Sequence, residues 1–121
     1  NLHPKFFPVP GDDASRLIIA VDQHDGADAA MRLCGALLSA VWADERNIAD
    51  HAVLAELLHE QQIDTARLEQ SKQAGAQSAY QAYTDEALKL GVFGAPTFVV
   101  DGELFWGQDR LEFLQRRLQA V

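Results

Sequence analysis

A single β-hairpin signal after a long helical stretch limits the possible folds of this chain more than any other part of the sequence. Residues Thr97–Val100 form a short β-prone run, Asp101-Gly102 is a strong two-residue turn, and Glu103–Trp106 is the return strand. Two strands alone are only marginally stable in water. Because residues 98–100 are all apolar, as in a strand buried on both faces, the hairpin is predicted to belong to a larger sheet.

The rest of the chain carries helical periodicity. Apolar stripes and capping residues predict helices that begin near Asp12, Ala29, Asp50, Asp64 and Ala76, and a last helix capped by Asp109. Gly26 and Gly91 are expected to end two of these helices. Residues 29–43 are apolar nearly all round, which predicts a central, buried helix with Cys34 packed inside it.

The composition narrows the classes of partner and site. The chain has 121 residues and a net charge of −8, which argues against a nucleic acid or a membrane surface as partner. A lone cysteine excludes an internal disulfide, a redox Cys-x-x-Cys pair and a cysteine-based zinc site. The histidines show no metal-ligand spacing, so no metal is expected. No transmembrane segment or secretory signal is visible, and a cytoplasmic location is expected.

No other segment supplies the strands that the hairpin needs. The sequence is therefore interpreted as the C-terminal part of a larger α/β domain that is mostly helical within this chain. Residues 1–90 are predicted to be a linker and a helical insertion, and residues 91–121 a ββα unit. The missing strands are expected from an upstream segment or from a second copy in a homodimer.

Two short segments beside the hairpin are candidates for ligand binding. Ala95-Pro96 lies between a helix stop and a strand, where a cis peptide would offer the Ala95 backbone to an extended ligand. An ordinary trans proline that opens a strand is the alternative. Residues 106–109 lead into the last helix, whose first N–H groups favour a carboxylate. Asp109 could accept from a ligand ammonium group, or it could simply cap the helix.

The stretch GVFGAPTFVVDGELFWGQDR, residues 91–110, resembles the C-terminal signature of the 2-hydroxychromene-2-carboxylate isomerase family. That family groups with kappa-class glutathione transferases and DsbA-like disulfide oxidoreductases, on a thioredoxin fold with a helical insertion. Gly-Val-Phe-Gly, Ala-Pro-Thr, the Asp-Gly turn and Phe-Trp-Gly-x-Asp-Arg occur in order. The remaining residues resemble the family's helical insertion less specifically. The resemblance implies the C-terminal part of a thioredoxin-like fold.

The resemblance also implies glutathione as cofactor. It implies a cis Ala95-Pro96 bond, with the Ala95 backbone offered to the cysteinyl part of glutathione. The segment that matches the family's γ-glutamyl contact consists of Trp106, Gly107, Gln108 and Asp109. The family often has Asn where this chain has Gln108, and the extra methylene shifts the side-chain amide.

The family's catalytic serine follows the first strand of an N-terminal βαβ unit that this sequence does not contain. Ser15, Ser39, Ser71 and Ser78 all fall in helical patterns, so no catalytic residue is predicted and this chain alone is expected to be inactive.

The resemblance implies that the parent protein is a bacterial, glutathione-dependent isomerase or transferase that acts on a small aromatic compound. A DsbA-like disulfide oxidoreductase and a non-enzymatic helical interaction module are the alternatives. Trp42, Tyr80 and Tyr83 stand at helical spacing typical of a core, with an aromatic-substrate pocket as the other interpretation.

Overall fold

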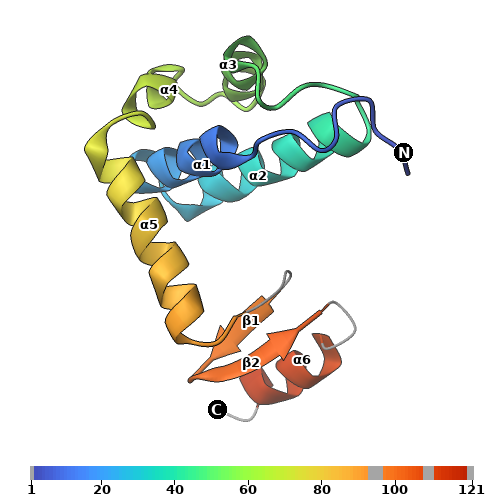
Figure 1. The fold of residues 1–121 in the computed structure, drawn as a ribbon, viewed down its shortest axis with the longest axis vertical. Coiled ribbons are helices and arrows are strands. Elements are labelled where there is room, and N and C mark those ends of the chain that lie inside the picture. Colours follow the sequence, from blue (N-terminus) through green and yellow to red (C-terminus); the bar gives the residue numbers. More distant parts are fainter. Residues whose placement is uncertain (1, 93–96, 108–110, 120–121) are drawn as a thin grey trace. The chain divides into compact units, whose positions relative to one another are not determined.

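A computed structural model describes residues 2–92, 97–107 and 111–119. Within these ranges the elements are α1 (Asp12–Asp25), α2 (Ala27–Trp42), α3 (His51–Glu60), α4 (Ala66–Gln70), α5 (Ala74–Lys89), β1 (Thr97–Val100), β2 (Glu103–Trp106) and α6 (Leu111–Gln119) (Figure 1). This order of helices, hairpin and final helix is the predicted one. The chain divides into two compact units, Asn1–Gln81 and Ala82–Val121, called unit 1 and unit 2 below. No described helix is long and apolar enough to cross a membrane.

Unit 1 is built on α1 and α2, which pack side by side, with α3 and α4 against them (Figure 1). The largest side chains that are fully buried are Leu17, Leu33, Leu54, Leu58 and Val21, from the first three helices. Full burial of each such side chain contributes roughly 1.5–3 kcal/mol before the cost in entropy. The core of unit 1 therefore depends on leucines that three different helices bring together.

The prediction that residues 29–43 are buried all round is wrong for α2. Leu33 and Leu37 are buried, but Met31 is 71% exposed, Leu38 57% and Trp42 39%. The cause is that the neighbouring helices of unit 1 cover one side of α2 and leave the opposite stripe uncovered. Cys34 is only half-buried for the same reason, instead of packing inside a closed core.

The cap predicted at Asp50 is present, whereas the N-cap of α4 is Thr65 and not Asp64 as predicted. The Asp50 carboxylate accepts from the Ala52 N–H at 2.9 Å and caps α3. Asp64 accepts from the Ala66 N–H at 2.9 Å, just before α4. Arg67 of α4 also donates to Asp25 at the end of α1, at 2.8 Å, and so connects segments 42 residues apart. This bond raises the pKa of Arg67 and lowers the pKa of Asp25.

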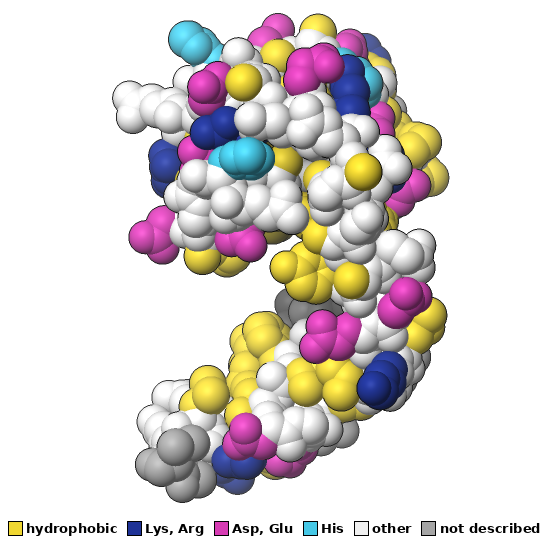
Figure 2. All heavy atoms as spheres, turned by 90° about the vertical axis from the view of Figure 1, so that its left-hand side faces the viewer, with side chains coloured by type: hydrophobic (Ala, Val, Ile, Leu, Met, Phe, Trp, Pro, Cys, Tyr) yellow, Lys and Arg dark blue, Asp and Glu magenta, His cyan; other side chains and the backbone are white. Residues whose placement is uncertain are grey.

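Unit 2 contains the hairpin and α6. Asp101 and Gly102 both have positive φ, 49° and 82°, as a type I′ turn requires. The strands are antiparallel, with Phe98 opposite Phe105. The helix α6 contacts both strands, and Phe105 of β2 and Leu114 of α6 are buried. The prediction that residues 98–100 are buried on both faces is wrong for the described residues, because Phe98 is 38% exposed. The described sheet has only two strands, and hydrophobic side chains lie on the surface of unit 2 in the lower part of Figure 2.

Candidate functional site

The two predicted binding segments are attached to the same end of the hairpin. Thr97, which follows Pro96 in the sequence, is paired with Trp106 across the sheet. The pairing places the start of β1 beside the end of β2, from which Gly107 leads on toward α6. Ala95, Pro96, Gln108 and Asp109 themselves lie outside the described residues, and so does the predicted cis bond at Ala95-Pro96. The described cis peptide is Phe7-Pro8.

Trp106 and Gly107 are the members of the predicted site that the structure describes. Trp106 is the last residue of β2 and is 50% exposed. Gly107 follows with φ of 90°, in the region that only glycine occupies without strain. The chain thus turns out of the sheet directly after a half-exposed indole, whose large apolar ring can pack against a ligand.

The direction of α6 determines which helix end lies near Trp106. Arg117, close to the C-terminal end of α6, pairs with Asp101 at 2.8 Å and with Glu103 at 3.4 Å, both at the turn end of the hairpin. The first turn of α6 therefore lies toward the opposite end, where β2 finishes at Trp106. N–H groups at the start of a helix lack internal partners and carry the positive end of the dipole. The positive end of the α6 dipole therefore lies toward the Trp106 end of the hairpin, and the first turn of the helix also carries Glu112.

The aromatic residues proposed as a substrate pocket have separate contacts. The ring of Trp42 packs on Phe7 with 4.9 Å between centroids. The Tyr80 hydroxyl donates to Asp12 Oδ1 at 2.8 Å, and this bond raises the pKa of Tyr80. Tyr83 is 56% exposed and belongs to unit 2. The contacts of Trp42 and Tyr80 are with different parts of unit 1, the N-terminal lead-in and the start of α1.

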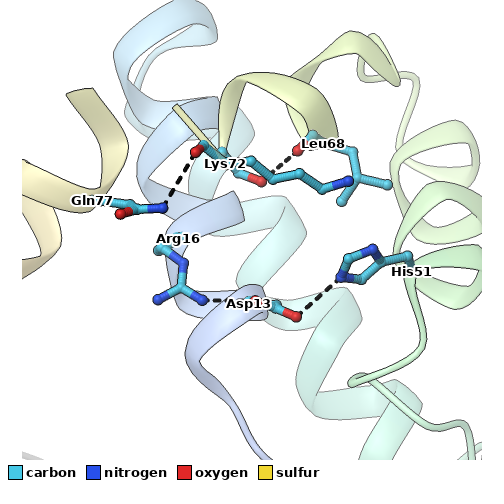
Figure 3. A pocket seen from close by; sticks show the side chains of 7 residues that line it. Asp13, Arg16, His51, Leu68, Lys72 and Gln77 are labelled. Atoms are coloured by element: carbon cyan, nitrogen blue, oxygen red, sulfur yellow. Dashed lines mark hydrogen bonds and ion pairs between the residues drawn. The ribbon is translucent and has the colours of Figure 1, made fainter. Parts of the chain in front are cut away.

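Sequence reasoning missed a polar cavity in unit 1. It holds about 200 Å³ and is lined by residues of α1, α3 and the α4–α5 region (Figure 3). Asp13 accepts from Arg16 at 2.7 Å and is paired with His51 Nε2 at 3.0 Å. Both bonds lower the pKa of Asp13, the one to His51 most. The Asp13–Arg16 spacing of three was visible in the sequence, whereas His51 lies 38 residues from Asp13 and no local pattern joins them.

This cavity contains a serine whose hydroxyl has no general base as hydrogen-bond partner among the described residues. Ser71 is 4% exposed, and its hydroxyl donates to the Leu68 carbonyl at 2.6 Å. In the described part of the chain no hydrogen bond joins Ser71 to His51, which is paired with Asp13 instead. The arrangement lacks the nucleophile–base contact that a serine nucleophile needs. No group of three potential metal ligands occurs among the described residues.

Comparisons with known proteins show which family and which solved structure the chain resembles. A model of the DSBA-like thioredoxin domain matches residues 3–119. A 2-hydroxychromene-2-carboxylate isomerase of Sphingobium xenophagum is 48% identical over 42 residues, which are 35% of this chain and 22% of that protein. A solved structure of a 2-hydroxychromene-2-carboxylate isomerase matches with a TM-score of 0.73 and 26% identity, over 97% of this chain and 58% of that one. The chain thus spans less than two thirds of either relative.

Proposed function

The chain belongs to the DSBA-like thioredoxin family, and on that basis we propose that it is part of a glutathione-dependent isomerase or transferase. The matches confirm the predicted resemblance and the thioredoxin-like fold class. Two relatives carry the name of an isomerase, which supports an isomerase-like enzyme. Glutathione and a small aromatic substrate are our proposal, and it rests on residues 91–110.

The observation that carries the proposal is the pairing of Thr97 with Trp106 beside the first turn of α6. It supports a binding site in which Trp106 packs on the peptide and the positive helix end attracts the γ-glutamyl carboxylate. Gly107 adds no side chain at this position. Glutathione would supply a thiol nucleophile for reversible addition to an unsaturated substrate. The residues of this chain would bind and orient it, and none is assigned to the chemical step.

A disulfide oxidoreductase is the second candidate, because the matching family model is the DsbA-like domain. The lone Cys34 cannot form a redox pair within these residues, and it is half-buried in α2. The two candidates differ in what unit 2 binds. An isomerase or transferase needs the γ-glutamyl end of glutathione at Trp106, whereas a disulfide oxidoreductase needs no such preference.

The test is an NMR titration of the ¹⁵N-labelled chain with reduced glutathione and with the dipeptide Cys-Gly. We expect saturable shifts of the Trp106 indole N–H and the Gly107 amide with glutathione, and weaker ones with Cys-Gly. Trp106→Ala should weaken binding about tenfold, which corresponds to about 1.4 kcal/mol. Leu118→Ala, which removes another exposed side chain of unit 2, is the control and should leave affinity unchanged. Equal responses to both peptides would remove the support for glutathione.

A further inference from the structure

The polar cavity of unit 1 is a second candidate site, and it has positive charge on a chain whose net charge is −8. Arg16 and Lys72 line it together with a single carboxylate, that of Asp13. The two cations of the lining, Arg16 and Lys72, outnumber its one carboxylate. The lining residues therefore carry more cations than anions, and Glu69, which pairs with Lys72, is not one of them.

Asp13 positions two of the basic side chains. Figure 3 shows Arg16 and His51 approaching its carboxylate from opposite sides, and each takes a different oxygen. Arg16 uses Nη2 for this bond, and its guanidinium also lies 5.9 Å from the Tyr80 ring centroid. A guanidinium carries five N–H donors, so a group held in this way keeps donors for a ligand. The side chain is oriented before any ligand arrives, which lowers the entropy cost of binding.

Lys72 is a second donor for an anion. Its ammonium pairs with Glu69 at 3.1 Å, but the Glu69 side chain is 78% exposed. Such an exposed pair contributes little and competes weakly with a ligand. The backbone at Lys72 is restrained, because Gln77 Nε2 donates to its carbonyl at 3.2 Å. Leu68 adds an apolar wall to the same cavity.

From these groups we infer that the cavity binds a small organic monocarboxylate. The carboxylate would accept N–H bonds from Arg16 and Lys72, and the apolar part of the ligand would lie against Leu68. A cavity of about 200 Å³ has the volume of roughly seven water molecules at about 30 Å³ each. The inference concerns unit 1 and does not depend on glutathione binding.

The experiment is a titration of the ¹⁵N-labelled chain with sodium benzoate at an ionic strength kept constant with sodium chloride. If benzoate binds in the cavity, we expect saturable chemical-shift changes of the Arg16 Nε–H and of the Lys72 and Gln77 amides. Lys72→Gln should weaken benzoate about fivefold, the effect expected for one partly exposed charge. Lys89→Gln removes the same charge from an exposed position of α5 outside the cavity and should change nothing.

A second variant tests the arginine independently. Arg16→Lys keeps the charge but loses the planar fork, and we expect it to weaken benzoate binding as well. Shifts that never saturate, or equal affinities for the Lys72→Gln and Lys89→Gln variants, overturn the inference. Inorganic phosphate is the remaining probe. If it binds the same residues more tightly than benzoate, the assignment to a monocarboxylate is wrong.

Discussion

Replacing Gly26 by alanine tests how α1 is joined to α2. Gly26 is the single residue between the two helices, and its backbone is bonded to both. Its N–H donates to Asp22 and its carbonyl accepts from Ala30, at 3.1 and 3.2 Å. Its φ of 92° and ψ of 175° lie in a region that only glycine occupies readily. A Cβ at this position meets no heavy atom within 4 Å, so any cost of Gly26→Ala comes from the backbone.

Two opposing effects determine how much Gly26→Ala changes the free energy of unfolding. The strained backbone costs about 1–3 kcal/mol for a residue with a Cβ. Alanine also lowers the conformational entropy of the unfolded chain, which stabilises the folded state by about 0.4–1 kcal/mol. We therefore expect Gly26→Ala to lower the free energy of unfolding by about 1–2 kcal/mol.

Gly35 gives a matched control for the same chemical change. Gly35 lies inside α2 and is exposed to solvent, and a Cβ at this position also meets no heavy atom within 4 Å. In a helix interior alanine is better than glycine, so Gly35→Ala should stabilise unit 1 by about 0.5–1 kcal/mol. The two variants are compared by urea unfolding followed by far-UV circular dichroism. Opposite shifts of the midpoint are expected. Stabilisation by both variants would refute the strained geometry at Gly26.

Three further variants test the capping, the core and the ion pairs of unit 1. Asp50→Ala removes the cap of α3 and should cost about 1 kcal/mol in urea unfolding; an unchanged midpoint would contradict the cap. Leu54→Ala, at a fully buried position, should cost about 3–5 kcal/mol by the same measurement, and a loss under about 1 kcal/mol would mean that the core is not closed there. Arg67 lowers the pKa of Asp25, so this carboxylate stabilises the folded state above its unfolded pKa of 3.8, and that stability is lost as pH falls through the lower folded pKa. Asp25→Asn should therefore lower the urea midpoint at pH 7 and make that midpoint less sensitive to acid between about pH 5 and 2. Midpoints of the variant and the original chain that fall in parallel with pH would contradict this.

Much of unit 2 is predictable from local signals. An Asp-Gly pair between two β-prone runs demands a type I′ turn, and a two-residue turn leaves one register for the strands. That register alone pairs Thr97 with Trp106. Two segments of the candidate site that are separated in sequence can therefore be assigned to one end of the hairpin from the turn and its flanking strands.

The cavity of unit 1 cannot be predicted in this way. Asp13, His51 and Lys72 belong to separate helical segments, and their neighbourhood depends on how those helices pack. The exposed stripe of α2 has the same origin. Helical periodicity shows that residues share a face, but it does not show whether another helix covers that face. The apolar run of α2 predicts Met31 and Leu38 in a core for this reason, and both are exposed in the structure.

Local sequence is sufficient to specify the helix cap at Asp50, the break at Gly26 and the hairpin turn, together with the family signature around it. Each of these depends on sterics and hydrogen bonds within a few neighbouring residues. The packing of the folded chain sets which face of α2 is buried, the partners of Asp13 and the direction of α6 along the hairpin. These features arise from contacts between residues far apart in the chain, where burial of apolar surface selects one packing that no local pattern specifies.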